Sequence, residues 1–206
     1  MIKYKVDSNI RYESVDELLV NTPKVVLVNK FNEEAAKKFR EQIEEAVNTG
    51  QSTIPVVIDS YGGEVYSLLS MIDTINSIPS GVQVATVITG KAMSCGAVLF
   101  TFGAEGHRYM GPNATLMIHD VSSFAHGKVE EIKADAKESE RLNDLIYSMM
   151  ARNCGHADQK YFWKIVHDKG RSDWFLDVKE AIGHNLTNHS RIPSYTLSVK
   201  YEACFG

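Results

Sequence analysis

The sequence predicts an α/β domain with a largely parallel sheet, and three observations support this prediction. Four short apolar runs have the length and composition of buried strands, namely 24–28, 55–59, 82–88 and 114–119. Apolar residues recur at helical spacing between these runs. No internal repeat, low-complexity segment or linker interrupts the 206 residues, so we expect a single domain over 1–206. Apolar strands that alternate with helices are typical of a parallel sheet with helices packed against it.

Each predicted helix has one apolar face. The first helix follows strand 24–28, and its face is Ala36, Phe39, Ile43 and Val47. The second follows strand 55–59, ends near Pro79, and has Val65, Leu68, Leu69, Ile72 and Ile75 on its face. These spacings predict two amphipathic helices that pack on the sheet.

The remaining elements follow the same reasoning. Strand 82–88 ends before Gly90, and a helix of small residues begins near Ser94. After the fourth strand, 121–127 has the composition of an extended or turn segment, and a long amphipathic helix is predicted over about 128–153. Residues 195–201 alternate between apolar and polar, which predicts an extra strand.

The bulk composition restricts the class of protein. The chain is 44% hydrophobic and 23% charged with a formal net charge of −4, which argues against nucleic acid as the main partner. We expect no membrane association, because no apolar run reaches the length of a membrane span and Met1–Asp7 lacks an apolar signal core. The three cysteines, Cys95, Cys154 and Cys204, fit neither a disulfide framework nor a zinc site. We therefore expect a cytoplasmic protein with no metal or cofactor.

Ser94 lies among small residues directly after an apolar strand, in the segment 90–97 (Gly-Lys-Ala-Met-Ser-Cys-Gly-Ala). This pattern predicts a strand, a tight turn and a helix, with the hydroxyl exposed beside unpaired backbone N–H groups that can hold an oxyanion. The same small residues could instead form a packing seam between a helix and the sheet. The segment therefore indicates a candidate nucleophile without establishing one.

Two other strand ends carry candidate groups. His119 ends the fourth apolar run, and histidine is the usual base that activates a serine. The pair Gly62-Gly63 follows strand 55–59 and allows backbone N–H groups to approach a ligand closely. Four aspartates are chemically suitable partners for the histidine: Asp120, Asp168, Asp173 and Asp177. Asp120 is disfavoured, because adjacent strand residues point to opposite faces.

Three segments together resemble the Clp protease proteolytic subunit family, ClpP. They are 58–63 (Ile-Asp-Ser-Tyr-Gly-Gly), 90–97 and 112–119 (Pro-Asn-Ala-Thr-Leu-Met-Ile-His), and they occur in the family's order and rough spacing. Segment 171–176, followed by Glu180-Ala181, resembles the family's segment with the triad acid. The resemblance covers roughly 14–188 and implies the ClpP/crotonase-like fold, with repeated β-β-α units and a protruding handle over about 120–153.

The resemblance also implies a mechanism. Ser94 would be the nucleophile, His119 the general base and Asp173 the residue that orients the imidazole. The backbone N–H groups of Gly63 and Cys95 would form the oxyanion hole. The Cys95 side chain itself is expected to serve packing rather than redox chemistry.

The resemblance implies a particular assembly as well. We expect a tetradecamer of two heptameric rings that cleaves peptides and unfolded proteins, fed by an AAA+ unfoldase such as ClpX, ClpA or ClpC. Uncharged residues expected along the substrate channel, Val65, Met93 and Phe124, predict a preference for apolar side chains. The chain has no phosphate-binding Gly-x-x-x-x-Gly-Lys-Ser/Thr loop, so ATP-driven unfolding would come from the partner.

The sequence departs from the family's pattern at several positions. Tyr61 replaces the usual proline of the Gly-Gly turn, and 121–126 replaces a Gly-rich stretch that pairs with substrate in the family. Ser172 replaces an arginine that makes an inter-ring contact. Of three positions that help to dock the ATPase, two lack the aromatic residue and one keeps it: Pro55, Val57 and Tyr109. A C-terminal extension over about 190–206 lies outside the resemblance.

Two other classes of protein remain open from the sequence. One is a ring component with the ClpP fold but no catalytic activity. The other is an acyl-CoA enzyme of the crotonase fold, which uses paired backbone N–H groups without a serine nucleophile. Covalent labelling of Ser94 by a fluorophosphonate distinguishes the peptidase from both.

Overall fold

The computed structural model describes residues 23–122 and 126–194. Within this part of the chain, six strands form one sheet in the order β1-β2-β3-β5-β6, with β4 paired to β3. All neighbouring strands are parallel except β5 and β6, which are antiparallel. The strands are β1 (Val26–Val28), β2 (Thr53–Ser60), β3 (Gln83–Met93), β4 (Arg108–Met110), β5 (Thr115–Ile118) and β6 (Trp174–Leu176).

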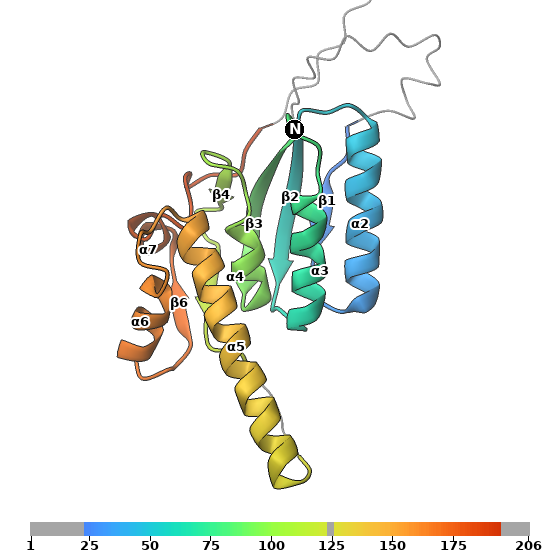
Figure 1. Cartoon of the computed structure of the whole chain (residues 1–206). Coiled ribbons are helices and arrows are strands. Elements are labelled where there is room, and N and C mark those ends of the chain that lie inside the picture. Colours follow the sequence, from blue (N-terminus) through green and yellow to red (C-terminus); the bar gives the residue numbers. More distant parts are fainter. Residues whose placement is uncertain (1–22, 123–125, 195–206) are drawn as a thin grey trace, which may run out of the picture.

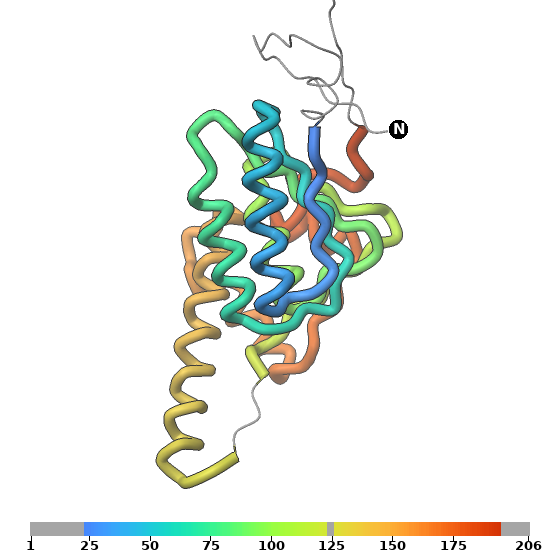
Figure 2. The backbone as a smooth tube through the Cα atoms, turned by 90° about the vertical axis from the view of Figure 1, so that its right-hand side faces the viewer, coloured from blue at the N-terminus to red at the C-terminus, as the bar shows by residue number. Residues whose placement is uncertain are grey.

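Helices α2 (Glu33–Asn48) and α3 (Val65–Asn76) pack side by side against one face of the sheet (Figures 1 and 2). The described helices are α2 (Glu33–Asn48), α3 (Val65–Asn76), α4 (Cys95–Phe100), α5 (Val129–Asn153), α6 (Tyr161–Asp168) and α7 (Val178–Gly183). The apolar face predicted for α2 is buried at Ala36, Phe39 and Ile43. The α/β class predicted from the sequence is therefore confirmed.

The third strand is longer than the sequence indicated. Strand β3 does not end before Gly90 but continues to Met93, because the residues around Gly90 form a β-bulge within the strand and not a turn after it. The β2–β3 register passes from Ile58↔Ile88 to Ser60↔Ala92, so β3 contains two extra residues there. Gly90 has φ 131°, a conformation that suits glycine. The second half of β3 then pairs with β5, which brings the residue after Met93 beside the end of β5.

Helix α5 confirms the long helix predicted over about 128–153, and its first half projects beyond the rest of the domain (Figures 1 and 2). Val129 and Ile132 on this projecting half are exposed. The second half is anchored in the core by Leu142, Ile146, Tyr147, Met150 and Ala151. One end of the helix is thus integral to the domain, while the other presents apolar side chains outside it.

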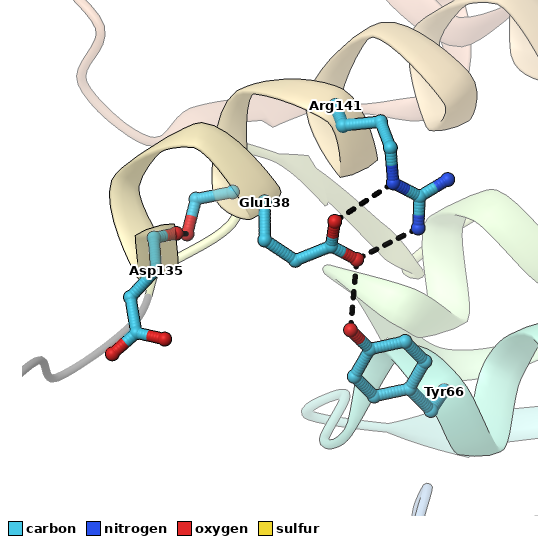
Figure 3. A network of polar contacts seen from close by, with 5 residues as sticks. Tyr66, Asp135, Glu138 and Arg141 are labelled. Atoms are coloured by element: carbon cyan, nitrogen blue, oxygen red, sulfur yellow. Dashed lines mark hydrogen bonds and ion pairs between the residues drawn. The ribbon is translucent and has the colours of Figure 1, made fainter. Parts of the chain in front are cut away.

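A polar network joins α5 to α3 where the projecting half begins (Figure 3). The Tyr66 hydroxyl donates to Glu138 Oε1 at 2.8 Å, and Arg141 donates to both oxygens of the same carboxylate at 2.7 and 2.8 Å. Hydrogen bonds from Arg141 and then from Tyr66 lower the pKa of Glu138 to about 2. Glu138 therefore stays ionised at neutral pH and keeps the contact between α3 and α5.

Arg108 on β4 ties four segments together from a buried position. Its side chain is only 4% exposed, and its guanidinium donates to the carbonyl oxygens of Gly103, Asn153, Asn185 and Leu186 at 2.9–3.4 Å. These carbonyls lie after α4, at the end of α5 and after α7. A buried cation that satisfies otherwise unpaired carbonyls holds these chain segments against β4.

We expect Arg108→Met to destabilise the protein by about 3–5 kcal/mol, because two buried and two partly buried carbonyl oxygens would lose their donor. Urea unfolding at a fixed protein concentration measures the change. The matched control is Arg152→Met at an exposed position in the last turn of α5, which should alter stability by less than about 0.5 kcal/mol. Equal unfolding midpoints for both variants would contradict the proposed role of Arg108.

Several sequence predictions fall outside the described residues. The strand predicted over 195–201, Phe124, Cys204 and the N-terminal segment before residue 23 all belong to this group. Among the residues that the structure does describe, no helix is long and apolar enough to span a membrane.

Candidate active site

Ser94 lies at a sharp corner between β3 and α4. Met93 is the last residue of β3 and Cys95 is the first residue of α4, so Ser94 alone makes the change of direction. Its backbone has φ 55° and ψ −120°, in the region that non-glycine residues rarely adopt. The Ser94 N–H donates to the Met117 carbonyl oxygen at 2.9 Å, which fixes the corner against β5. A strained, well-anchored serine at a strand-to-helix corner is typical of a nucleophile.

The Gly62-Gly63 turn lies directly against Ser94. A Cβ on Gly62 would lie 2.7 Å from the Cβ of Ser94, and a Cβ on Gly63 would collide with the Phe31 carbonyl oxygen. Both glycines have positive φ, 102° and 149°. The Phe31 carbonyl also accepts a hydrogen bond from the N–H of Glu64 at 2.9 Å. Glycine is therefore required at both positions by the space available and by the backbone conformation.

The backbone N–H groups of Gly63 and Cys95 flank the serine. Within the described part of the chain neither N–H donates a backbone–backbone hydrogen bond, so both can bind an oxygen. The Cys95 thiol donates to the Gly63 carbonyl oxygen at 3.2 Å. Burial raises the pKa of this thiol to about 11, which keeps it protonated at neutral pH. The contact ties α4 to the glycine turn, in keeping with the packing role expected for this side chain.

His119 and Asp173 face each other across the edge of the sheet. His119 follows β5 and Asp173 precedes β6, and the antiparallel pair Ile118↔Trp174 brings the two residues together. The distance from His119 Nδ1 to Asp173 Oδ1 is 3.8 Å, which suits an ion pair and is too long for a hydrogen bond. The side chains are 22% and 56% exposed. Of the four aspartates that the sequence left open, Asp173 is therefore the one whose carboxylate lies within ion-pair distance of the His119 imidazole in the described residues.

The other candidate acids have different surroundings. Asp120 Oδ1 accepts from the Tyr147 hydroxyl at 2.9 Å. Asp177 is the N-cap of α7, where it accepts from the Glu180 N–H at 2.9 Å. Asp168 is the last residue of α6.

One cavity of about 50 Å³ brings together four of the five predicted site residues. Gly63, Ser94, Cys95 and His119 line it. Its remaining wall is mostly apolar and consists of Val65, Ala97, Val98, Ile118, Val121, Ser122, Ile146, Tyr147 and Met150. Asp173 does not line the cavity and reaches it only through its contact with His119. In the described residues no hydrogen bond joins Ser94 to His119, an arrangement often seen in hydrolase sites without substrate.

Sequence reasoning did not identify Tyr147 and the other α5 residues in this wall. Their only signal was helical periodicity, which shows that a helix has an apolar face but not against which part of the sheet that face packs. Val65, one of the three predicted channel residues, does line the cavity, whereas Met93 does not. The described residues contain no group of three histidine, cysteine or acidic side chains that could hold a metal ion.

The structure thus brings a serine, a histidine and two backbone N–H groups together at the carboxyl ends of the parallel strands β2, β3 and β5. The sequence model of the Clp protease family matches residues 7–189, and the chain belongs to that family. The two alternatives to a peptidase, a crotonase-fold acyl-CoA enzyme and a non-catalytic ring component, are not favoured by this match.

Curated relatives named ATP-dependent Clp protease proteolytic subunit agree with this assignment. One from Dehalococcoides mccartyi is 34% identical over 133 residues, which are 65% of this chain and 63% of the relative. One from Bacteroides thetaiotaomicron is 37% identical over 137 residues, which are 66% of this chain and 59% of the relative. The aligned segment thus spans less than two thirds of the length of these relatives.

We expect Gly63→Ala to lower peptide cleavage by about a hundredfold to a thousandfold. The added methyl group would displace the turn from Phe31 and move the Gly63 N–H away from Ser94. The matched control is Gly81→Ala, because Gly81 also has a positive φ of 98° but nothing within 4 Å of its Cβ position. This control should cost about 1–3 kcal/mol of stability without changing activity. Equal activity of the two variants, measured as kcat for a fluorogenic peptide, would contradict the prediction.

Proposed function

We propose that the chain is a serine endopeptidase with Ser94 as nucleophile, His119 as general base and Asp173 as the orienting acid. One observation carries this proposal. In a chain of the Clp protease family, Ser94 and His119 line the same cavity as the unpaired N–H groups of Gly63 and Cys95. Each group that acyl transfer requires is therefore present within one small volume.

The proposed reaction proceeds in two stages. Ser94 Oγ attacks the peptide carbonyl carbon while His119 accepts the hydroxyl proton, and the developing oxyanion is bound by the N–H groups of Gly63 and Cys95. The tetrahedral intermediate collapses when His119 donates that proton to the leaving amine. Water then attacks the acyl-enzyme, with His119 again as base, and releases the carboxylic acid product. Asp173 stabilises the imidazolium that forms in both stages.

The geometry indicates what substrate binding must change. Because His119 and Asp173 are 3.8 Å apart and no hydrogen bond joins Ser94 to His119, the three side chains must close up before proton transfer. The mainly apolar wall favours peptides with an apolar residue before the scissile bond.

We further propose that the chain assembles into two stacked heptameric rings and receives substrate from an AAA+ unfoldase such as ClpX, ClpA or ClpC, in the cytoplasm. Several large apolar side chains are exposed in the described part of the chain, on β1, β6 and the projecting half of α5: Leu27, Phe175, Val129 and Ile132. Such exposure is typical of surfaces that are buried in an assembly. A closed ring would also keep the active site away from folded cellular proteins.

The experiment that tests the proposed function compares three substrates without ATP or a partner protein. The purified chain should cleave a short fluorogenic apolar peptide and an unfolded protein, and it should leave a stable folded protein intact, since unfolding requires about 5–15 kcal/mol. Native mass spectrometry of the same sample should give about fourteen subunits. A ring that cleaves no peptide would support the non-catalytic component, and rapid loss of the folded protein would contradict a gated chamber.

A further inference from the structure

A second histidine–aspartate pair lies beside the proposed catalytic pair. His167 Nε2 is 3.9 Å from Asp120 Oδ2, and His119 Nδ1 is 3.8 Å from Asp173 Oδ1. In the proposed catalytic pair the histidine follows β5 and the aspartate comes from the later part of the chain, whereas in the second pair the aspartate follows β5 and the histidine comes from the later part. His119 and its neighbour Asp120 follow β5, while His167 and Asp173 lie on α6 and just before β6.

Asp120 is fixed more firmly than Asp173. The Tyr147 hydroxyl donates to Asp120 Oδ1 at 2.9 Å, and Tyr147 is only 2% exposed. Burial and then the charge of Asp120 raise the pKa of Tyr147, so its hydroxyl remains a donor at any pH used for assay. The imidazole of His167 stacks on Trp163 at a centroid distance of 3.6 Å, which orients the ring toward Asp120.

The segment after His119 depends on these side-chain contacts. Regular pairing between β5 and β6 ends at Ile118↔Trp174, one residue before His119. Beyond it, the Val121 N–H donates to Asn143 Oδ1 at 2.6 Å. Asn143 and Tyr147 are one turn apart on α5, so a single face of this helix holds the two residues that follow His119.

We propose that Asp120, held by Tyr147 and paired with His167, is a positioning residue that fixes the backbone of the general base His119, while Asp173 orients the imidazole itself. This inference rests on the proposed function and deepens it. The His119–Asp173 distance is too long for a hydrogen bond, so Asp173 alone does not hold His119 in place. The backbone of His119 is fixed through Asp120, which anchors it to α5 and α6. The projecting helix is thereby coupled to the catalytic base through one carboxylate.

The test uses the assembled full-length chain and expresses kcat per active site, counted from the end point of fluorophosphonate labelling. Tyr147→Phe and Asp120→Ala should each lower kcat by about tenfold or more while KM changes less than twofold, because a displaced base affects the chemical step more than binding. Asp120→Asn should retain at least half of the kcat, because its amide oxygen still accepts from Tyr147. The matched control is Tyr66→Phe, which removes the other tyrosine–carboxylate hydrogen bond to α5 and should leave kcat unchanged.

The outcomes separate this inference from the proposed function. Wild-type kcat per labelled site in both Tyr147→Phe and Asp120→Ala, or an equal loss in Tyr66→Phe, would overturn the role of Asp120. A loss confined to thermal stability or to the number of labelled sites would overturn it too, since kcat per site would be intact. If Asp120→Ala does not assemble, Tyr147→Phe decides by the same criterion, because it removes a single oxygen atom. A wild-type chain that is neither labelled nor active would instead overturn the proposed function.

Discussion

Replacing Ser94 with alanine should lower peptide cleavage by on the order of a million-fold, to background, because the nucleophile would be absent. The fold should persist. Alanine is smaller than serine, and the Ser94 N–H that donates to the Met117 carbonyl oxygen is retained. The unfolding temperature of the variant should therefore stay within a few degrees of the wild type.

A matched serine provides the control for this variant. Ser77 is an exposed residue at the C-terminus of α3, where its hydroxyl donates to the Thr74 carbonyl oxygen. Ser77→Ala should keep wild-type kcat in the same peptide assay. Substantial cleavage by purified Ser94→Ala would contradict the assignment of the nucleophile.

Replacing Asp173 with asparagine should lower kcat by about ten-thousandfold. Asparagine has nearly the same shape, but its amide group cannot stabilise the His119 imidazolium by charge and can favour the wrong tautomer of the ring. KM should change little, because Asp173 lies outside the cavity in which the substrate carbonyl would bind. Steady-state kinetics with the fluorogenic peptide measures both constants.

Asp177 offers a close comparison four residues away. Its side chain is exposed, as that of Asp173 is, and it caps α7 by accepting from the Glu180 N–H. Since asparagine is as good an N-cap as aspartate, Asp177→Asn should retain both stability and activity. Equal kcat values for Asp173→Asn and Asp177→Asn would rule out Asp173 as the orienting acid.

Hydrophobic patterning was sufficient to predict the sheet and most of its helices. The runs that became β1, β2, β3 and β5 are apolar because the parallel strands lie in the core. Strands β4 and β6 were not predicted from the sequence, since β4 begins with the charged residue Arg108 and the apolar run at β6 is only three residues long, between Asp173 and Asp177. The predicted end of β3 was wrong, because a glycine in a β-bulge cannot be distinguished by sequence from a glycine in a turn.

For the candidate site, too, some residues could be predicted from local sequence and others could not. Local sequence indicated Ser94, His119 and the Gly62-Gly63 turn, because each lies at the end of a strand. The choice of Asp173 depended on a resemblance, since its proximity to His119 arises from β6, which adds to the sheet in the antiparallel direction. The contacts of Asp120 with Tyr147 and His167 join segments 27 and 47 residues apart, and no local pattern indicates them.

Mass spectrometry after fluorophosphonate labelling tests the central claim most directly. The intact chain should gain one adduct per subunit, and fragmentation should place that adduct on Ser94, because only an activated serine reacts with this class of reagent. His119→Ala should strongly slow the labelling. An unlabelled wild-type chain, or an adduct on a serine other than Ser94, would contradict the account.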